Sequence, residues 1–142
     1  MAEKDVNQYN NLVRRRNTAR RQYNACSDRI EECNYLLRRL RRAKERVAEQ
    51  KRTFKTIKKE DSKIYKEKYD WEGKKYNSFK VKGEVAVDLN EDYYKNTLDY
   101  VLDSINNEIT RIENKRMNEY GLLGRLGSTI NSLGNKIENF FN

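Results

Sequence analysis

The sequence has no proline, no histidine and only six glycines among its 142 residues. The absence of proline and the scarcity of glycine favour long, uninterrupted helices. Without histidine, the commonest general base and a frequent metal ligand are both missing. The sequence also contains no Gly-rich phosphate loop and no G-x-S-x-G motif. We therefore expect a protein that is not an enzyme and that holds no cofactor or metal.

Long apolar runs are also lacking. Hydrophobic residues make up 36% of the chain and charged residues 37%, which suits amphipathic helices better than a compact globule. No run approaches the roughly 20 apolar residues of a membrane span, and the start, MAEKDVNQYNN, lacks the apolar core of a signal peptide. We expect a cytoplasmic protein without stable membrane insertion, and any export would use a route without a cleaved leader.

The only two cysteines, Cys26 and Cys33, are seven residues apart. On one helix this spacing corresponds to about 10 Å along the axis, which is too far for an intrachain disulfide. We expect two small core residues in a reducing compartment. A disulfide to a partner protein is the alternative.

Charge is plentiful but unevenly placed. Residues 1–69 hold 21 Lys/Arg and 10 Asp/Glu, which gives a net charge of +11. Residues 70–142 hold 10 Lys/Arg and 12 Asp/Glu, which gives a net charge of −2. Halves of opposite sign would attract each other in a hairpin. The remaining basic surface could meet an acidic partner, nucleic acid or an anionic membrane.

Apolar residues recur in alternating steps of four and three, which is the heptad pattern of packed helices. In the first half these positions are Leu12, Arg16, Ala19, Tyr23, Cys26, Ile30, Cys33, Leu37, Leu40, Lys44, Val47, Lys51 and Phe54. In the second half they are Leu98, Leu102, Ile105, Ile109, Ile112, Arg116, Glu119, Leu123, Leu126, Ile130, Leu133, Ile137 and Phe140. We call these positions the seam.

Two stripes of matching length predict one all-α domain over residues 1–142, a long, coiled-coil-like antiparallel helical hairpin. We expect a first helix over about 5–66, a bend over about 67–75, and a second arm over about 76–140 with a kink near 83–92. A turn near Gly73 would pair seam residues whose numbers sum to about 145. Ile30 would then lie near Ile112, and Leu12 near Leu133.

Five seam positions are charged: Arg16, Lys44, Lys51, Arg116 and Glu119. If these side chains are buried, they cost stability but can fix the register of the helices. The alternative, which we favour, is that their stems lie along the seam while their charges reach water.

Further apolar residues flank the seam and widen each stripe beyond what one partner helix can cover. We infer that the hairpin docks on more helices, from a second copy or from another protein. Gly124 and Gly127 would form a smooth patch for close approach of another backbone, or would simply add local flexibility. The predicted partner-binding residues are Leu36, Val101, Leu122, Leu123, Gly124, Leu126, Gly127, Phe140 and Phe141, with Val13 also flanking the seam.

A basic segment, LLRRLRRAKER, carries arginines on both sides of the seam positions Leu37 and Leu40. This face could be solvated, could bind an acidic helix, or could contact nucleic acid phosphates. Because the heptad pattern runs through the segment, the helix is already committed to packing, and we expect no nucleic acid partner. The predicted basic face consists of Arg38, Arg39, Arg41 and Arg42.

The single tryptophan lies near the middle of the chain, as Trp71-x-Gly73 followed by Phe79. One interpretation is a tryptophan that caps the seam and a glycine that makes the turn. This layout of long helix, Trp-x-Gly, nearby Phe and second long helix also resembles the WXG-type hairpins of type VII secretion. It is most similar to the YwqH-like proteins that accompany LXG toxins in Gram-positive bacteria.

The resemblance implies a non-enzymatic adaptor or targeting chaperone. Such a protein would bind the N-terminal helical LXG region of a toxin, alone or beside a second small helical hairpin, and help present it to the secretion machinery. Trp71, Gly73 and Phe79 would form the recognised bend, and the protein could leave the cell with its cargo. Tyr120 has no acidic residue four positions later, so the chain departs from the C-terminal signal of some members. The alternatives are a self-associating structural coiled coil and a basic binder of nucleic acid or membrane surfaces.

Overall fold

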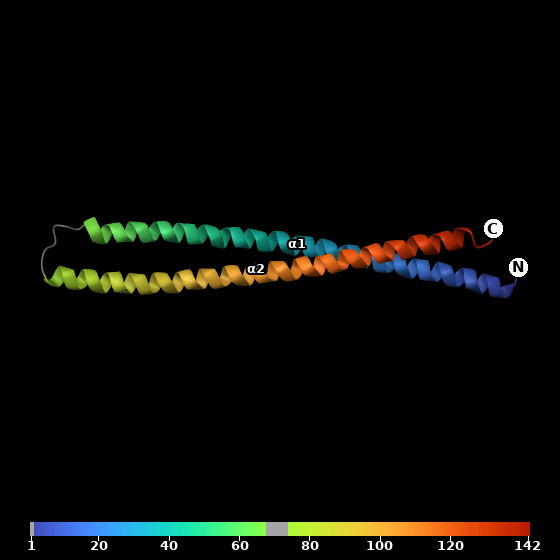
Figure 1. Ribbon diagram of the computed structural model, residues 1–142, viewed down its shortest axis with the longest axis horizontal. Helices are drawn as coiled ribbons and strands as arrows, with labels where there is room; N and C mark the ends of the chain where they lie inside the picture. Colours follow the sequence, from blue (N-terminus) through green and yellow to red (C-terminus); the bar gives the residue numbers. More distant parts are fainter. Residues whose placement is uncertain (1, 68–73) are drawn as a thin grey trace. The chain divides into compact units, whose positions relative to one another are not determined.

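The fold consists of two long helices, α1 (Glu3–Glu67) and α2 (Lys74–Glu138). The computed structural model describes the backbone of residues 2–67 and 74–142, and the side chains of residues 2–60 and 90–142. Within these ranges every regular element is a helix. The two helices pack against each other as an antiparallel hairpin (Figure 1), which confirms the predicted all-α class.

The helix ends lie close to the predicted ones. Glu3 and Asp5 occupy the first turn of α1, where negative charge is favoured by the exposed N–H groups of the helix. Lys136 occupies the last turn of α2, where positive charge is favoured for the opposite reason. The range 83–92 is helical throughout. A kink of the helix within this range stays a prediction. Trp71 and Gly73 fall outside the described residues, and the side chain of Phe79 does too.

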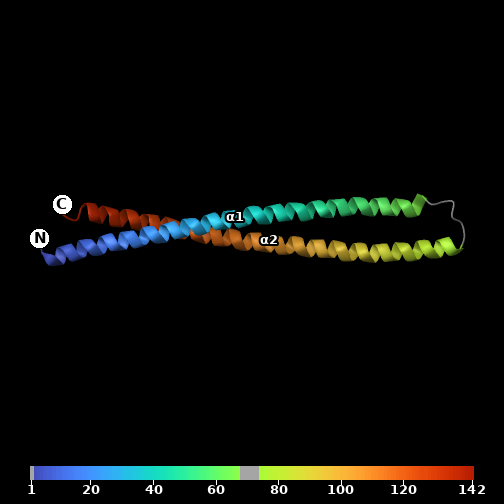
Figure 2. The same cartoon turned by 180° about the vertical axis from the view of Figure 1, so that it is seen from behind.

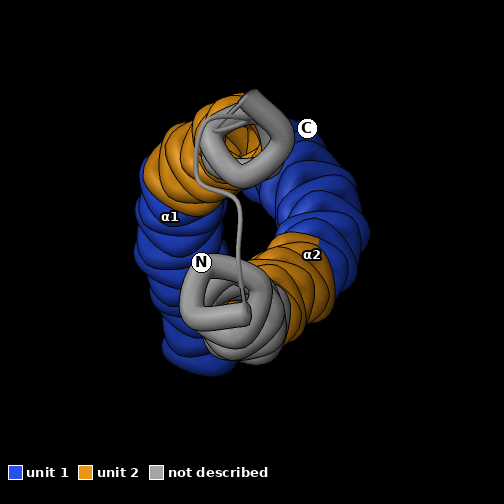
Figure 3. Tube along the Cα trace, turned by 90° about the vertical axis from the view of Figure 1, so that its left-hand side faces the viewer, with its two compact units in different colours: residues 1–38, 110–142 blue, residues 39–109 orange. Residues whose placement is uncertain are grey.

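The hairpin divides into two compact units, and both helices contribute to each (Figure 3). Unit 1 comprises residues 1–38 and 110–142, and unit 2 comprises residues 39–109. Unit 1 contains both termini, which lie at the same end of the hairpin in both views (Figures 1 and 2).

Burial follows the predicted seam closely. All eight buried apolar residues of the described part of the chain are seam positions. The remaining seam positions are half-buried, except for Lys44, which is exposed. The heptad pattern therefore identified the packed face of each helix. The buried residues are Ala19, Cys26, Ile30, Cys33, Leu37, Leu98, Ile112 and Leu133.

The pairing between the helices is close to the expected register. Cys26 contacts Glu119, with numbers that sum to 145 as expected. In unit 2, Lys51 contacts Asp99, which sum to 150. The observed register therefore differs from the expected one by up to about five residues, a little more than one helical turn.

Candidate partner-binding site

A polar cluster interrupts the apolar seam of unit 1. The Cys26 thiol lies 3.1 Å from both Oε2 and the backbone oxygen of Glu119, and the carboxylate accepts its hydrogen bond. Nε of Arg29 donates to Oε1 of the same carboxylate over 3.0 Å. Glu119, one of the predicted charged seam residues, is thus held by two side chains of α1.

These contacts shift the pKa values of Glu119, Cys26 and Arg29, and each shift favours a charged Glu119–Arg29 pair beside a neutral thiol. The hydrogen bond from Arg29, with a further one from Cys26, lowers the pKa of Glu119 and keeps it ionised. Burial, reinforced by the adjacent carboxylate, raises the pKa of the Cys26 thiol. The hydrogen bond to Glu119 raises the pKa of Arg29. The cluster therefore contains a neutral thiol beside a stable ion pair, which makes Cys26 a poor nucleophile.

The other charged seam residues divide between the two interpretations. Nη1 of Arg116 donates to Oδ1 of Asn34 over 2.8 Å, and Nζ of Lys51 pairs with Oδ1 of Asp99 at 2.5 Å. Arg16 is half-buried, and its Nε has no hydrogen-bond partner among the described residues. The contacts of Arg116 and Lys51 support a role in fixing the register of the helices. Lys44 is exposed instead, as expected for a side chain whose charge reaches water.

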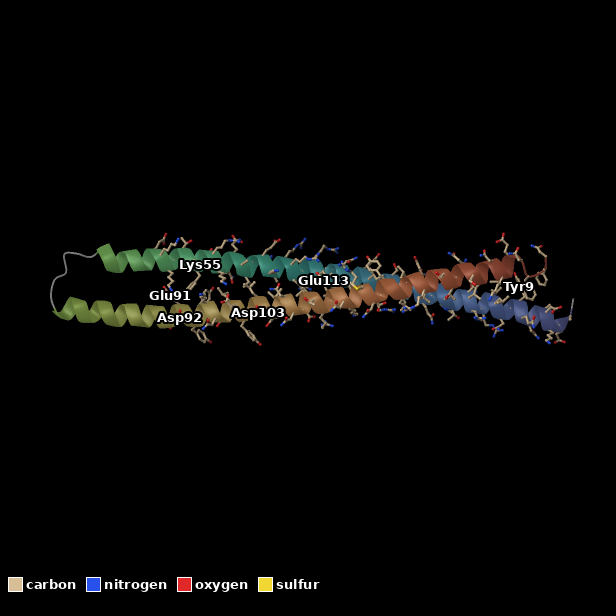
Figure 4. All side chains as sticks on the ribbon, in the orientation of Figure 1. Tyr9, Lys55, Glu91, Asp92, Asp103 and Glu113 are labelled. Atoms are coloured by element: carbon tan, nitrogen blue, oxygen red, sulfur yellow. The ribbon has the colours of Figure 1, made fainter. Side chains whose placement is uncertain are left out.

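An aromatic cluster of Tyr9, Phe140 and Phe141 lies near the ends of the two helices in unit 1. The ring of Tyr9 lies 5.7 Å from that of Phe140 and 5.2 Å from that of Phe141, centroid to centroid. Figure 4 shows Tyr9 on α1 beside the C-terminal end of α2. Phe140 is half-buried, while Phe141 remains 55% exposed. The two phenylalanines predicted as partner contacts are therefore already engaged with α1, Phe141 only in part.

The other partner-binding residues predicted on α2 of unit 1 have mixed surroundings. Leu122, Leu123 and Leu126 are half-buried. A Cβ at Gly127 would lie 3.8 Å from Cε2 of Tyr23, so Gly127 faces α1 of the same chain. A Cβ at Gly124 would meet nothing within 4 Å. The two glycines therefore do not share one open patch, and a partner contact at these residues stays a prediction.

In unit 2, a buried carboxylate lies between the helices. Glu91 on α2 is 6% exposed and points towards α1 (Figure 4). Nζ of Lys58 lies 3.2 Å from its Oε2, yet this oxygen accepts no hydrogen bond from the described residues. The pair is thus held by charge alone. Burying a carboxylate in this way costs stability that a pair of apolar residues would not cost.

Unit 2 also opens into a groove of about 700 Å³. Its apolar end is built from Phe54, Ile57 and Tyr94. The rings of Phe54 and Tyr94 pack at 4.7 Å between centroids, while Ile57 is 47% and Tyr94 40% exposed. The volume falls within the range of sites that hold a ligand or a few side chains. The full lining is Arg46, Glu49, Gln50, Thr53, Phe54, Ile57 and Tyr94.

The groove follows one face of α1. Arg46, Gln50, Thr53 and Ile57 recur at steps of four, three and four, which places them in one row along a helix. From Arg46 to Ile57 the row covers about 16 Å. This length corresponds to about three turns of an α-helix.

The arginines of the predicted basic face are open to solvent. Arg38, Arg39, Arg41 and Arg42 are all exposed. Two further predicted partner contacts, Leu36 on α1 and Val101 on α2, are half-buried. None of these six residues lines the groove.

The sequence prediction missed Ile57 and Tyr94, the two exposed residues at the apolar end of the groove. Ile57 follows the seam residue Phe54 by three positions, and Tyr94 precedes Leu98 by four. Each is thus a neighbour of a seam residue on the same helix face. This spacing is the signal that could have identified them. Glu91 gave no comparable signal, because its burial depends on the facing helix.

Metal-binding clusters and membrane-spanning helices are both missing from the described part of the chain. No group of three or more cysteine, aspartate and glutamate side chains there is arranged to hold a metal ion. The described helix segments are also too polar to cross a membrane.

Comparison with known proteins gives one family. A family model described as YwqH-like matches residues 14–135, and this range includes all seam positions except Leu12, Ile137 and Phe140. No curated protein and no solved structure matches the chain. Because the matched range covers most of the sequence and both helices, the chain belongs to the YwqH-like family.

Proposed function

We propose that this protein is a non-enzymatic adaptor that binds the N-terminal helical region of an LXG toxin and helps to target it for type VII export. Its partners would be the toxin, with or without a second small helical hairpin, and the secretion machinery. The proposal combines membership of the YwqH-like family with the helical hairpin of the structure.

The observation that carries the proposal is the groove of unit 2. In a hairpin packed only against itself, Ile57 and the Tyr94 ring that packs on Phe54 would gain nothing from remaining exposed. The row of Arg46, Gln50, Thr53 and Ile57 ends in an apolar cluster with Phe54 and Tyr94, and exposed apolar residues on a helix face can recognise an amphipathic helix. A docked toxin helix would cover this row and extend the two helices of unit 2 into a three-helix bundle.

Co-purification tests the binding step. The probe is the N-terminal helical region of the LXG protein encoded beside this chain. The double variant I57S/Y94S removes apolar surface from the groove and should weaken capture at least tenfold. The matched control is V6S/Y120S, which changes one valine and one tyrosine of similar exposure, 41% and 51%, in unit 1.

The outcomes separate the candidates. Normal capture by the control and loss by the groove variant would support the proposal. No capture by the wild-type protein, together with a symmetric dimer in size measurements, would favour a self-associating coiled coil instead. Circular dichroism establishes that each variant remains helical.

A second test concerns Trp71 at the expected bend. Trp71→Ala should reduce export of the toxin more than it reduces toxin binding, because the bend would be read by the secretion machinery. Secretion assays and co-purification measure the two effects separately. An equal loss in both would contradict this division of roles.

A further inference from the structure

The groove of unit 2, with the row of α1 residues along it, differs in chemistry at its two ends. Phe54, Ile57 and Tyr94 make one end apolar. Continuing the row from Arg46 towards the start of α1 by steps of four and three brings Arg42 and then Arg39 onto the same face. From Arg42 to Ile57 the distance along the helix is about 22 Å.

The basic end of the row belongs to a strongly basic stretch of helix. Residues 39–60 hold ten Lys/Arg and three Asp/Glu, or +7. Arg42 is exposed and Arg46 is exposed at the groove, and neither forms an ion pair with the described residues. Glu49 lines the groove between Arg46 and the apolar end and offsets one positive charge there. The uncompensated positive charge therefore lies around Arg42 and Arg46.

From this distribution we infer that the groove binds an amphipathic helix of the partner in one orientation, with apolar residues over Phe54, Ile57 and Tyr94 and carboxylates over Arg42 and Arg46. The reverse orientation would place those carboxylates over the apolar end, where they would lose water without gaining a charged partner. The partner helix is at least about four turns long, and its carboxylates lie about 8 to 15 residues from its apolar anchors.

This inference rests on the proposed function for the identity of the partner, and it adds the polarity and charge of the docked helix. Charges at the rim of an interface act mainly on the association rate and weaken with salt. The apolar anchors act mainly on the dissociation rate. The two ends of the row are therefore distinguishable by kinetics.

The test uses the full-length chain and the same LXG region, with binding followed by surface plasmon resonance at low and high salt. The variant R42E/R46E reverses two charges on the row. The matched control, R52E/K59E, makes the same change in net charge at exposed residues of α1 that lie more than a quarter turn from the row. We expect R42E/R46E to bind at least tenfold more weakly at low salt, chiefly through slower association, with a smaller difference at high salt. The control should lose less than threefold.

A charge exchange makes the test specific. Among single acidic-to-lysine variants of the LXG region, at least one should restore binding to R42E/R46E while it weakens binding to the wild-type chain. The absence of any restoring variant, or equal losses in R42E/R46E and R52E/K59E, would overturn the inference and leave the proposed function standing.

Two other outcomes are decisive. If the wild-type chain does not bind the LXG region, the proposed function and this inference fail together. If the chain dimerises and I57S/Y94S abolishes the dimer without affecting toxin binding, a second copy occupies the groove, and the inference is overturned alone.

Discussion

Unit 1 and unit 2 are built from the same two helices, but they are packed differently. Of the eight buried apolar residues in the described part of the chain, seven belong to unit 1 and only Leu98 belongs to unit 2. Unit 1 has small side chains in its seam, such as Ala19 and Cys26, which let the helices approach closely. The α1 seam of unit 2 instead contains Lys44 and Lys51 and borders a groove. Among the described side chains, unit 1 therefore has the more closely packed seam, and unit 2 is the one with the groove to which we assign the proposed partner.

The largest expected effect concerns the closed core of unit 1. Leu37 is fully buried, so Leu37→Ala should lower the free energy of unfolding by about 3 kcal/mol. Leu102→Ala in unit 2 removes the same atoms from a half-buried site and should cost about half as much. Urea unfolding followed by far-UV circular dichroism measures both. Equal losses would mean that the two units are packed alike.

A slightly smaller effect tests how tightly unit 1 is filled. Ala19 is 5% exposed, and Ala19→Leu would force extra atoms into its seam, at a cost of about 2 kcal/mol. Val47→Leu in the half-buried seam of unit 2 should cost less than about 1 kcal/mol. Thermal unfolding of the two variants compares them directly. If Ala19→Leu raises the melting temperature, the close packing inferred for unit 1 is wrong.

A gain is expected at Gly124, where an added Cβ meets nothing within 4 Å. Gly124→Ala should raise the free energy of unfolding by up to about 1 kcal/mol, because alanine favours the helix. If the partner binds in unit 2, its affinity should not change. Loss of binding in this variant would move the interface to the glycines of unit 1. Stability and co-purification measured on one preparation separate the two results.

The smallest effect is a pH dependence. The folded pKa of Glu119 is lowered by Arg29 and Cys26, so its contribution is present above the usual glutamate pKa of about 4.3 and is lost as the pH falls through the folded value. Glu119→Gln should flatten the acid side of the stability curve. Asp99→Asn in unit 2 should flatten it less, because the Asp99 side chain is 40% exposed and that of Glu119 is 16%. Stability measured from neutral to acid pH would reveal a reversed order.

The packed faces could be predicted from the sequence because a heptad repeat specifies them locally. Among the side chains that the structure describes, every buried apolar residue was a seam position, including the two cysteines. The register could be predicted only to about one turn. It depends on the bend and on specific cross-helix contacts, such as that of Glu119 with Cys26 and Arg29, which no single helix encodes.

The groove could not be predicted in the same way. Most of the predicted partner residues are on α2, where Leu122 flanks the seam and Leu126 belongs to it. In the structure these leucines are half-buried, whereas the groove is lined mainly by α1. An apolar residue beside the seam is covered or open according to the side chains across from it, and spacing on one helix does not contain that information. Glu91 was missed for the same reason.

Both sulfhydryl groups of the chain belong to unit 1, at 0% and 1% exposure for Cys26 and Cys33. A thiol-reactive dye can reach them only when the helices of that unit separate. The rate of dye labelling therefore records how often this half of the hairpin opens, with no engineered probe. The effect of the proposed partner on this opening could then be measured in the unaltered protein.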